Sequence, residues 1–250
     1  MMTRIKTAAE LVNQRQSGQM NATILELLGT SLQAGMTTKD LATIASNELK
    51  KLGGKPTFLG YGGFPDVLCV SVNHEIVHGI PSSYVLQDGD IVSFDFGVTY
   101  NGMITDAART KIVGDTASKT AHQLVRGTLA ALDQGIATLR DGVRVGTVAT
   151  AVEKEMQKHG FGIVRDLVGH GVGHELHEDP NIPNYTTGQK GPVLHAGMTI
   201  AIEPMATLGS HAVYTAADGW TILSKDHSMA AHFEDTVLIT NNGAEVLTRL

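Results

Sequence analysis

Two strand-like segments around Asn101-Gly102 constrain the fold more than any other feature of the sequence. Asn-Gly is the strongest short-range signal for a two-residue β-hairpin. The segments on either side, 90–98 and 102–108, show the alternating side-chain pattern of strands. The chain is therefore expected to contain a long antiparallel pair of strands here.

Two carboxylates interrupt this hairpin. A two-residue loop would pair Asp95 with Ala108 and Asp106 with Gly97, so both carboxylates would lie on one face as diagonal neighbours. In a half-buried sheet they would repel each other unless a proton or a cation lay between them. The hairpin thus predicts a site of unusual electrostatics.

Two further apolar segments carry the same kind of residue. Glu203 ends the run 198–202, and Glu234 begins the run 235–239. A single carboxylate at a strand end is usually solvated. Four such cases in one chain favour a shared site instead.

Periodicity divides the chain into four blocks. Helical spacing covers most of the first 50 residues, with a capped second helix from Thr37 to Leu52, and returns over 117–138 and 145–159. Strand patterns occupy 58–113 and the region after Gly160. No Ser/Pro/Gly linker divides the chain, so we expect one domain, 1–250, of α+β class, with two similar αβ halves that share a core.

Composition excludes several functions. The 250 residues carry a net charge of −6, so no basic excess points to nucleic acid or an anionic membrane. The single cysteine, Cys69, excludes an intrachain disulfide and a cysteine-based zinc site, so a metal site would use histidine and carboxylates. The chain shows neither a signal-peptide core nor a run of about 18 apolar residues, which predicts a cytoplasmic protein without membrane contact.

Histidines cluster in the Gly-rich segment 169–180, which contains His170, His174 and His177. The segment His174-Glu175-Leu176-His177 is one residue shorter than the HExxH motif of zincins, and the flanking glycines and Pro180 argue against the helix that this motif needs. A Gly-rich loop suits close approach of the backbone to a ligand.

Taken in order, these segments resemble the type I methionine aminopeptidases of peptidase family M24, in their short bacterial form. This family has the pita-bread fold, in which two pseudo-symmetric αβ halves surround a curved antiparallel sheet. The resemblance extends over nearly the whole chain and rests on Gly60–Pro65, Ser71–Asn73, Val77–Pro81, the segments around Asp95 and Asp106, Gly169–Gly173, His177-Glu178, Ile202–Pro204, Asp218–Thr221 and Phe233-Glu234.

The resemblance implies a dinuclear metal site. Its ligands would be Asp95, Asp106, His170, Glu203 and Glu234. Four carboxylates balance two divalent ions, whereas a single ion would leave two negative charges in a partly buried pocket. Oxygen and nitrogen ligands without thiolate suit Co, Mn, Fe or Zn.

The resemblance also implies the reaction: removal of the N-terminal methionine from newly made proteins and peptides with a small second residue. A metal-activated water would attack the first peptide bond. Glu203 would take the proton from that water, His177 would donate to the carbonyl oxygen as charge develops, and His78 would contact the peptide nitrogen or the second residue. The methionine side chain would lie in an apolar pocket lined by Phe58, Tyr61, Phe64, Cys69, Leu176 and Trp220.

The implied partners are nascent polypeptides with an N-terminal methionine, including chains at the ribosome, and the implied state is a monomer. Three positions depart from the family pattern: Val77, Leu176 and Asp235 stand where cysteine, an aromatic residue and histidine are frequent.

Two other readings remain open. Prolidases and X-Pro aminopeptidases share the five ligands, but they usually carry an extra N-terminal domain. A non-enzymatic binding protein of the same fold would have lost metal ligands.

Overall fold

The expected hairpin is present in the computed structural model, which describes residues 3–250. Strands β4 (Ile91–Tyr100) and β5 (Met103–Ile112) pair antiparallel along their whole lengths. Asp95 lies opposite Ala108, and Gly97 lies opposite Asp106, so the predicted register is confirmed.

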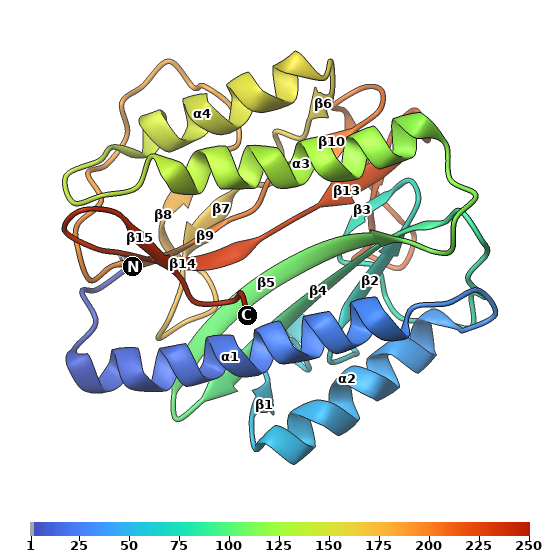
Figure 1. Cartoon of the computed structure of the whole chain (residues 1–250), viewed down its shortest axis with the longest axis horizontal. Coiled ribbons are helices and arrows are strands. Elements are labelled where there is room, and N and C mark those ends of the chain that lie inside the picture. The colour runs from blue at the N-terminus through green and yellow to red at the C-terminus, as the bar shows by residue number, and fades with distance from the viewer. Residues whose placement is uncertain (1–2) are drawn as a thin grey trace.

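Two helices cover one face of this hairpin (Figure 1). They are α1 (Ala8–Ser31) and α2 (Thr38–Leu52), and each begins at a threonine that forms a capping box. Gly53, with a φ of 81°, ends α2 in the left-handed conformation that favours glycine. The predicted second helix, from Thr37 to Leu52, is therefore confirmed.

The hairpin is buried on both faces, not on one. Val92, Phe94 and Phe96 belong to an apolar cluster with residues of α1 and α2. On the opposite face, Asp95 and Asp106 are also buried. The sequence pattern alone suggested a half-buried sheet, because small and charged residues normally face water.

The second half repeats the arrangement with α3 (Lys119–Ala137) and α4 (Val145–Lys158). Helix α3 packs on β9 (Thr199–Ile202), β10 (Met205–Thr207) and β13 (Ala230–His232). Helix α4 packs on α3 and contacts β6 (Gly162–Ile163) and β8 (Glu178–Ile182). The two helix pairs belong to two different large apolar clusters. The expectation of one shared core is therefore wrong: each half has its own, because polar residues lie between the halves.

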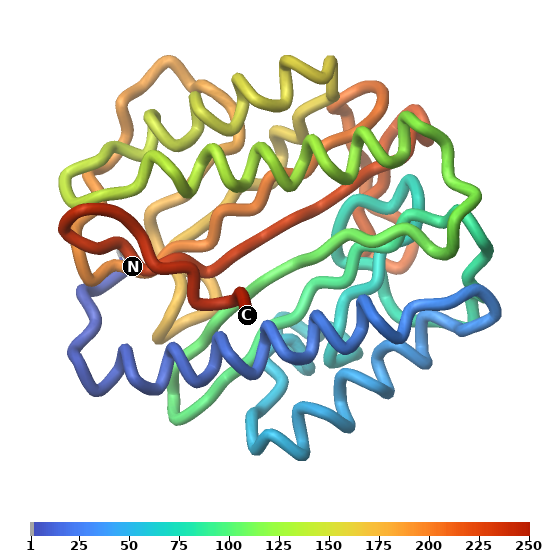
Figure 2. Tube along the Cα trace, in the orientation of Figure 1, coloured from blue at the N-terminus to red at the C-terminus, as the bar shows by residue number. Residues whose placement is uncertain are grey.

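Strand β14 (Asp235–Ile239) joins the two halves, since it runs beside β5 in Figures 1 and 2. At the junction, Ala108 and Glu234, which immediately precedes β14, exchange backbone hydrogen bonds of 3.2 and 3.0 Å. β14 also pairs with β9, and β9 pairs with β7 (Gly169–Gly171). The site described below lies at this junction.

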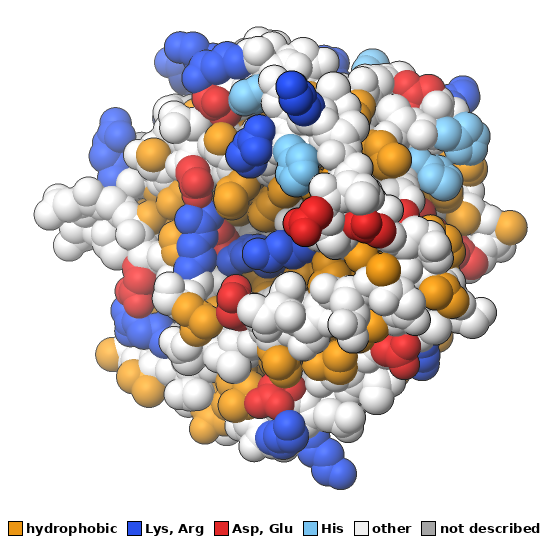
Figure 3. Space-filling view, turned by 45° about the vertical axis from the view of Figure 1, so that its right-hand side comes forward, with side chains coloured by type: hydrophobic (Ala, Val, Ile, Leu, Met, Phe, Trp, Pro, Cys, Tyr) orange, Lys and Arg blue, Asp and Glu red, His pale blue; other side chains and the backbone are white. Residues whose placement is uncertain are grey.

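Short strands complete the fold. They are β1 (Lys55–Pro56), β2 (Cys69–Val72), β3 (Glu75–Val77), β6 (Gly162–Ile163), β8 (Glu178–Ile182), β11 (Val213–Thr215), β12 (Ile222–Ser224) and β15 (Ala244–Val246), with a 3-10 turn at Tyr61–Gly63. Among residues 3–250, no helix is long and apolar enough to cross a membrane. On the face shown in Figure 3, basic and acidic side chains are interspersed.

Candidate active site

Strand register assembles the carboxylates. Asp95 on β4 lies opposite Ala108 on β5, and Ala108 in turn bridges to Glu234 at the start of β14. Asp235 pairs with Ile202 on β9, so the antiparallel register places Glu234 beside Glu203. Elements that are far apart in sequence thus bring their carboxylates to one junction.

Burial makes it unfavourable for all four carboxyl groups of this cluster to be ionised at once. The pKa of Asp95 is raised well above its usual value, first by burial and then by repulsion from Asp106 and Glu203. The pKa values of Glu203 and Glu234 are raised for the same two reasons, and burial raises that of Asp106 to about 7. Protons or cations must therefore accompany these groups.

Buried carboxylate oxygens without hydrogen-bond partners indicate a cation-binding site. One oxygen each of Asp95, Asp106 and Glu234 is buried without a hydrogen-bond partner among the described residues. Asp106, His170 and Glu234 also offer ligand atoms that lie within 4.8 Å of one another. Oxygen ligands with one imidazole fit a divalent metal ion.

His170 on β7 is oriented as a ligand. Its Nδ1 lies 2.9 Å from the carbonyl oxygen of Gly171, to which an Nδ1–H can donate, so Nε2 keeps its lone pair. Nε2 lies 3.5 Å from Glu203 Oε1 and 4.0 Å from Glu234 Oε1. Burial lowers the pKa of His170 to about 4, so the ring is neutral at pH 7 and able to bind a metal.

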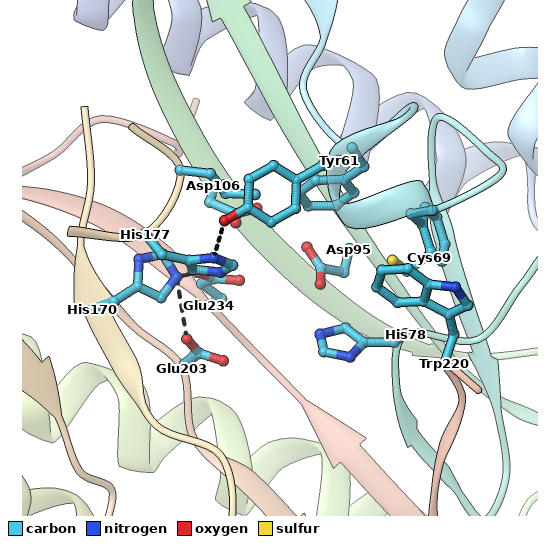
Figure 4. Close-up of a pocket in the computed structure, with 13 residues that line it drawn as sticks. Tyr61, Cys69, His78, Asp95, Asp106, His170, His177, Glu203, Trp220 and Glu234 are labelled. Carbon is cyan, nitrogen blue, oxygen red and sulfur yellow. Dashed lines mark hydrogen bonds and ion pairs between the residues drawn. The ribbon is translucent and has the colours of Figure 1, made fainter. Parts of the chain in front are cut away.

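His177 and His78 lie beside this cluster in Figure 4. His177 Nδ1 is 2.8 Å from the Tyr61 hydroxyl, and burial lowers the pKa of His177. His78 has a φ of 59°, a left-handed conformation that is uncommon for a residue with a side chain. Burial and the neighbouring His177 lower the pKa of His78 to about 4.

An apolar wall closes the other side of the pocket (Figure 4). Phe64 and Trp220 meet edge to face with their centroids 5.3 Å apart. The same cavity, with about 550 Å³ of empty space, is lined by every residue that the resemblance implied for the metal site, catalysis and the methionine pocket: Phe58, Tyr61, Phe64, Cys69, His78, Asp95, Asp106, His170, Leu176, His177, Glu203, Trp220 and Glu234. His174 lies elsewhere, with its Nε2 2.8 Å from Glu10.

Sequence reasoning missed two features. The Tyr61 hydroxyl was expected only to line the pocket, yet it contacts His177. His232 is buried next to Glu203 and Glu234. Its position two residues before Glu234 was a usable signal, because alternate residues of a strand share a face.

Comparison with known proteins decides the family. The sequence model that describes metallopeptidase family M24 matches residues 13–241 of this chain. The chain belongs to metallopeptidase family M24. Among relatives, a methionine aminopeptidase of Clostridium acetobutylicum is 42% identical over 245 residues, covering 98% of both chains, and methionine aminopeptidase 1 of Bacillus subtilis is 44% identical with the same coverage.

Solved structures agree with this M24 assignment. The crystal structure of methionine aminopeptidase from Thermotoga maritima has a TM-score of 0.97 and 46% identity, with full coverage of both chains. A prolidase from Pyrococcus furiosus has a TM-score of 0.79 and 25% identity, but this chain covers only 65% of it. The predicted α+β pita-bread fold is therefore confirmed.

The structure shows the surroundings of Asp235, one of the three positions expected to depart from the pattern of type I methionine aminopeptidases. Asp235 is fully buried, and its oxygens lie 2.7 Å from Arg109 Nη2 and 2.7 Å from Arg249 Nε. Two guanidinium groups thus compensate the carboxylate that replaces the frequent histidine. Arg109 Nη1 also donates to the carbonyl oxygen of Glu234 at 2.6 Å, which helps to hold this residue in place.

Proposed function

We propose that this chain is a metal-dependent methionine aminopeptidase that removes the N-terminal methionine from proteins and peptides with a small second residue. The observation that carries this proposal is a single cavity in which a buried cluster of carboxylates and histidines faces an apolar wall. The names of the full-length relatives support the same activity.

Asp95, Asp106, His170, Glu203 and Glu234 would hold two divalent ions, drawn from Co, Mn, Fe or Zn. Four buried carboxylates balance the charge of two such ions, and a lone ion would leave unbalanced anions at a cost of several kcal/mol each. When bound, the ions would polarise the scissile carbonyl and lower the pKa of a bound water.

The protein's own residues would move the protons. Glu203 would accept a proton from the attacking water as the general base. If the Tyr61 hydroxyl donates to His177 Nδ1, then Nε2 carries the proton and can donate to the carbonyl oxygen as negative charge develops. His78 would contact the peptide nitrogen or the second residue.

The pocket would select methionine by shape and polarity. Phe58, Phe64, Leu176 and Trp220 offer apolar contacts, and burying a methionine side chain contributes about 1.5–3 kcal/mol. Aromatic rings also favour contact with a thioether sulfur. The carboxylate-rich end of the cavity would receive the free α-amine, which restricts cleavage to the chain's N-terminus.

We further propose that residues 1–250 act as one catalytic domain and a monomer in the cytoplasm. Its substrates there would be nascent chains, including those at the ribosome.

A peptide panel tests the activity. Met-Ala-Ser is expected to be cleaved far faster than Met-Leu-Ser, because a large second residue would collide with the pocket rim near His78. Equal rates on the two peptides would contradict the substrate assignment. Preferential cleavage of Ala-Pro peptides would instead indicate a prolidase-like enzyme.

A further inference from the structure

His232 is a buried imidazole without an evident partner. It ends β13, is 1% exposed, and neither ring nitrogen has a hydrogen-bond partner among residues 3–250. Leaving a buried polar group without a hydrogen-bond partner destabilises the folded state. Such a group in a native structure needs an explanation, and binding of an ion is one.

The two neighbouring glutamates face this ring with one oxygen each. His232 Nε2 lies 3.8 Å from Glu203 Oε2 and 3.9 Å from Glu234 Oε2. His170 Nε2 occupies the corresponding place beside the Oε1 atoms of the same two residues, at 3.5 and 4.0 Å. The glutamate pair therefore lies between two imidazoles.

These separations suit a shared ion better than a hydrogen bond. Hydrogen bonds join heavy atoms at about 2.7–3.2 Å. Two ligands that each lie about 2.0–2.2 Å from one ion are separated by up to about 4.4 Å. Distances of 3.8 and 3.9 Å fall within the second range only.

We propose that His232 Nε2 is a further ligand of the metal centre and holds one of its divalent ions together with Glu203 and Glu234. The proposal rests on the metal centre of the proposed function and extends its set of five ligands. Glu203, His232 and Glu234 offer ligand atoms within 4.8 Å of one another, as do Asp106, His170 and Glu234. A neutral imidazole adds a ligand without disturbing the charge balance.

The backbone holds this ring in place. Thr110 on β5 accepts a hydrogen bond from His232 N at 3.0 Å and donates one to His232 O at 2.6 Å. Because Thr110 and Asp106 lie on the same strand, His232 is positioned relative to the carboxylate cluster by a rigid element. Such support is what a preorganised ligand requires.

The direct test is a crystal structure of the wild-type protein with Mn²⁺ or Co²⁺, in which anomalous scattering locates each ion. The proposal expects His232 Nε2 within about 2.0–2.3 Å of one ion. A distance beyond 3 Å to every ion would overturn it.

Binding in solution provides a second measurement. His232→Gln should weaken the binding of one ion at least 10-fold in competition with a chelator, while the metal-free variant keeps the Tm of the metal-free wild type. His122→Gln is the matched control, because His122 lies on α3 outside the pocket. Equal affinity of wild type and His232→Gln for every ion would contradict the proposal.

The outcomes separate this proposal from the proposed function. A wild-type enzyme that binds ions and cleaves Met-Ala-Ser, but leaves His232 Nε2 beyond 3 Å, overturns the ligand role alone. A wild-type protein that binds no ion overturns both.

Discussion

At the residue scale, His177 combines the contacts that a neutral proton donor needs. Its Nδ1 lies 2.8 Å from the Tyr61 hydroxyl, and its ring meets that of His170 edge to face at 4.4 Å. Burial lowers the pKa of His177, which favours the uncharged ring at pH 7. A Tyr61 hydroxyl that donates to Nδ1 would leave the proton of the neutral ring on Nε2.

Replacing His177 tests this role. His177→Ala should lower kcat for Met-Ala-Ser by about 10²–10³, the usual effect of losing one donor to a developing oxyanion. Metal content, measured by elemental analysis, should stay at the wild-type level because His177 is not among the proposed ligands. An unchanged kcat would reject the role, and a loss of metal would reassign His177 as a ligand.

The placement of individual side chains could be predicted where the strand pattern determined the face of the sheet on which they lie. Asp95 and Asp106 followed from a two-residue turn and strand alternation. His232 was missed because a lone histidine near a strand end is usually a surface or core residue. Its surroundings come from β9 and β14, which the local pattern does not reveal.

At the element scale, a glycine in β4 makes room for the pocket wall. A Cβ added at Gly97 would lie 2.7 Å from Phe58 Cε1 and 2.9 Å from Thr57 Cβ. The strand therefore needs glycine so that the Phe58 ring can pack on it. The position of Phe58 in the pocket thus depends on a residue of the hairpin.

Gly97→Ala should displace Phe58 and raise KM for Met-Ala-Ser several-fold, with a smaller change in kcat. The overpacking should also lower the free energy of unfolding by about 1–3 kcal/mol. Steady-state kinetics and thermal melting measure the two effects. Gly29→Ala on α1 is the matched control, because its Cβ would meet only the flexible Lys111 side chain, at 3.0 Å. A variant with wild-type KM would show that Phe58 does not shape the methionine pocket.

Helices and strands could be predicted where capping residues, turn residues and side-chain periodicity agreed. The capping residue Thr37 and the glycine at the end of α2 placed that helix, and the Asn101-Gly102 turn placed the hairpin. The short strands after Gly160 were expected only as a strand-rich region. Their pairing is non-local, since β14 contacts β5 from more than 120 residues away in sequence.

At the scale of the whole molecule, two apolar cores close over a polar junction. Carboxylates with raised pKa values lie there, so the metal-free fold contains groups that resist ionisation. A carboxyl group whose pKa is raised on folding stabilises the protein below its unfolded pKa. That contribution is lost as the pH rises through its folded pKa.

The metal-free protein should therefore melt at a lower temperature at pH 8 than at pH 5, because the pKa values of four buried carboxyl groups, Asp95, Asp106, Glu203 and Glu234, are raised. The lowered pKa values of the buried histidines His78, His170 and His232 act in the opposite direction, and we expect the four carboxyl groups to outweigh them. A decrease of roughly 5 °C or more is expected. Adding Mn²⁺ should restore stability mainly at pH 8, where the ligands are deprotonated. Calorimetry measures both effects, and a metal-free Tm that rises from pH 5 to pH 8 would contradict the burial of ionisable carboxylates.

The α+β class and the division into two αβ halves followed from the order of periodic segments. The separation into two cores did not, because periodicity shows which residues are apolar but not which of them pack together. The burial of both hairpin faces was hidden for the same reason: the residues that enclose Asp95 and Asp106, among them His170, Glu203 and Glu234, come from distant segments.

Hydrolysis of Met-Ala-Ser by protein stripped of metal with a chelator tests the central claim most directly. The metal-free protein should be inactive, and activity should return as divalent ions are added, reaching its maximum at two ions per chain. Full activity in a sample shown by elemental analysis to contain no metal would contradict the claim that buried carboxylates and histidines hold the ions that perform this reaction.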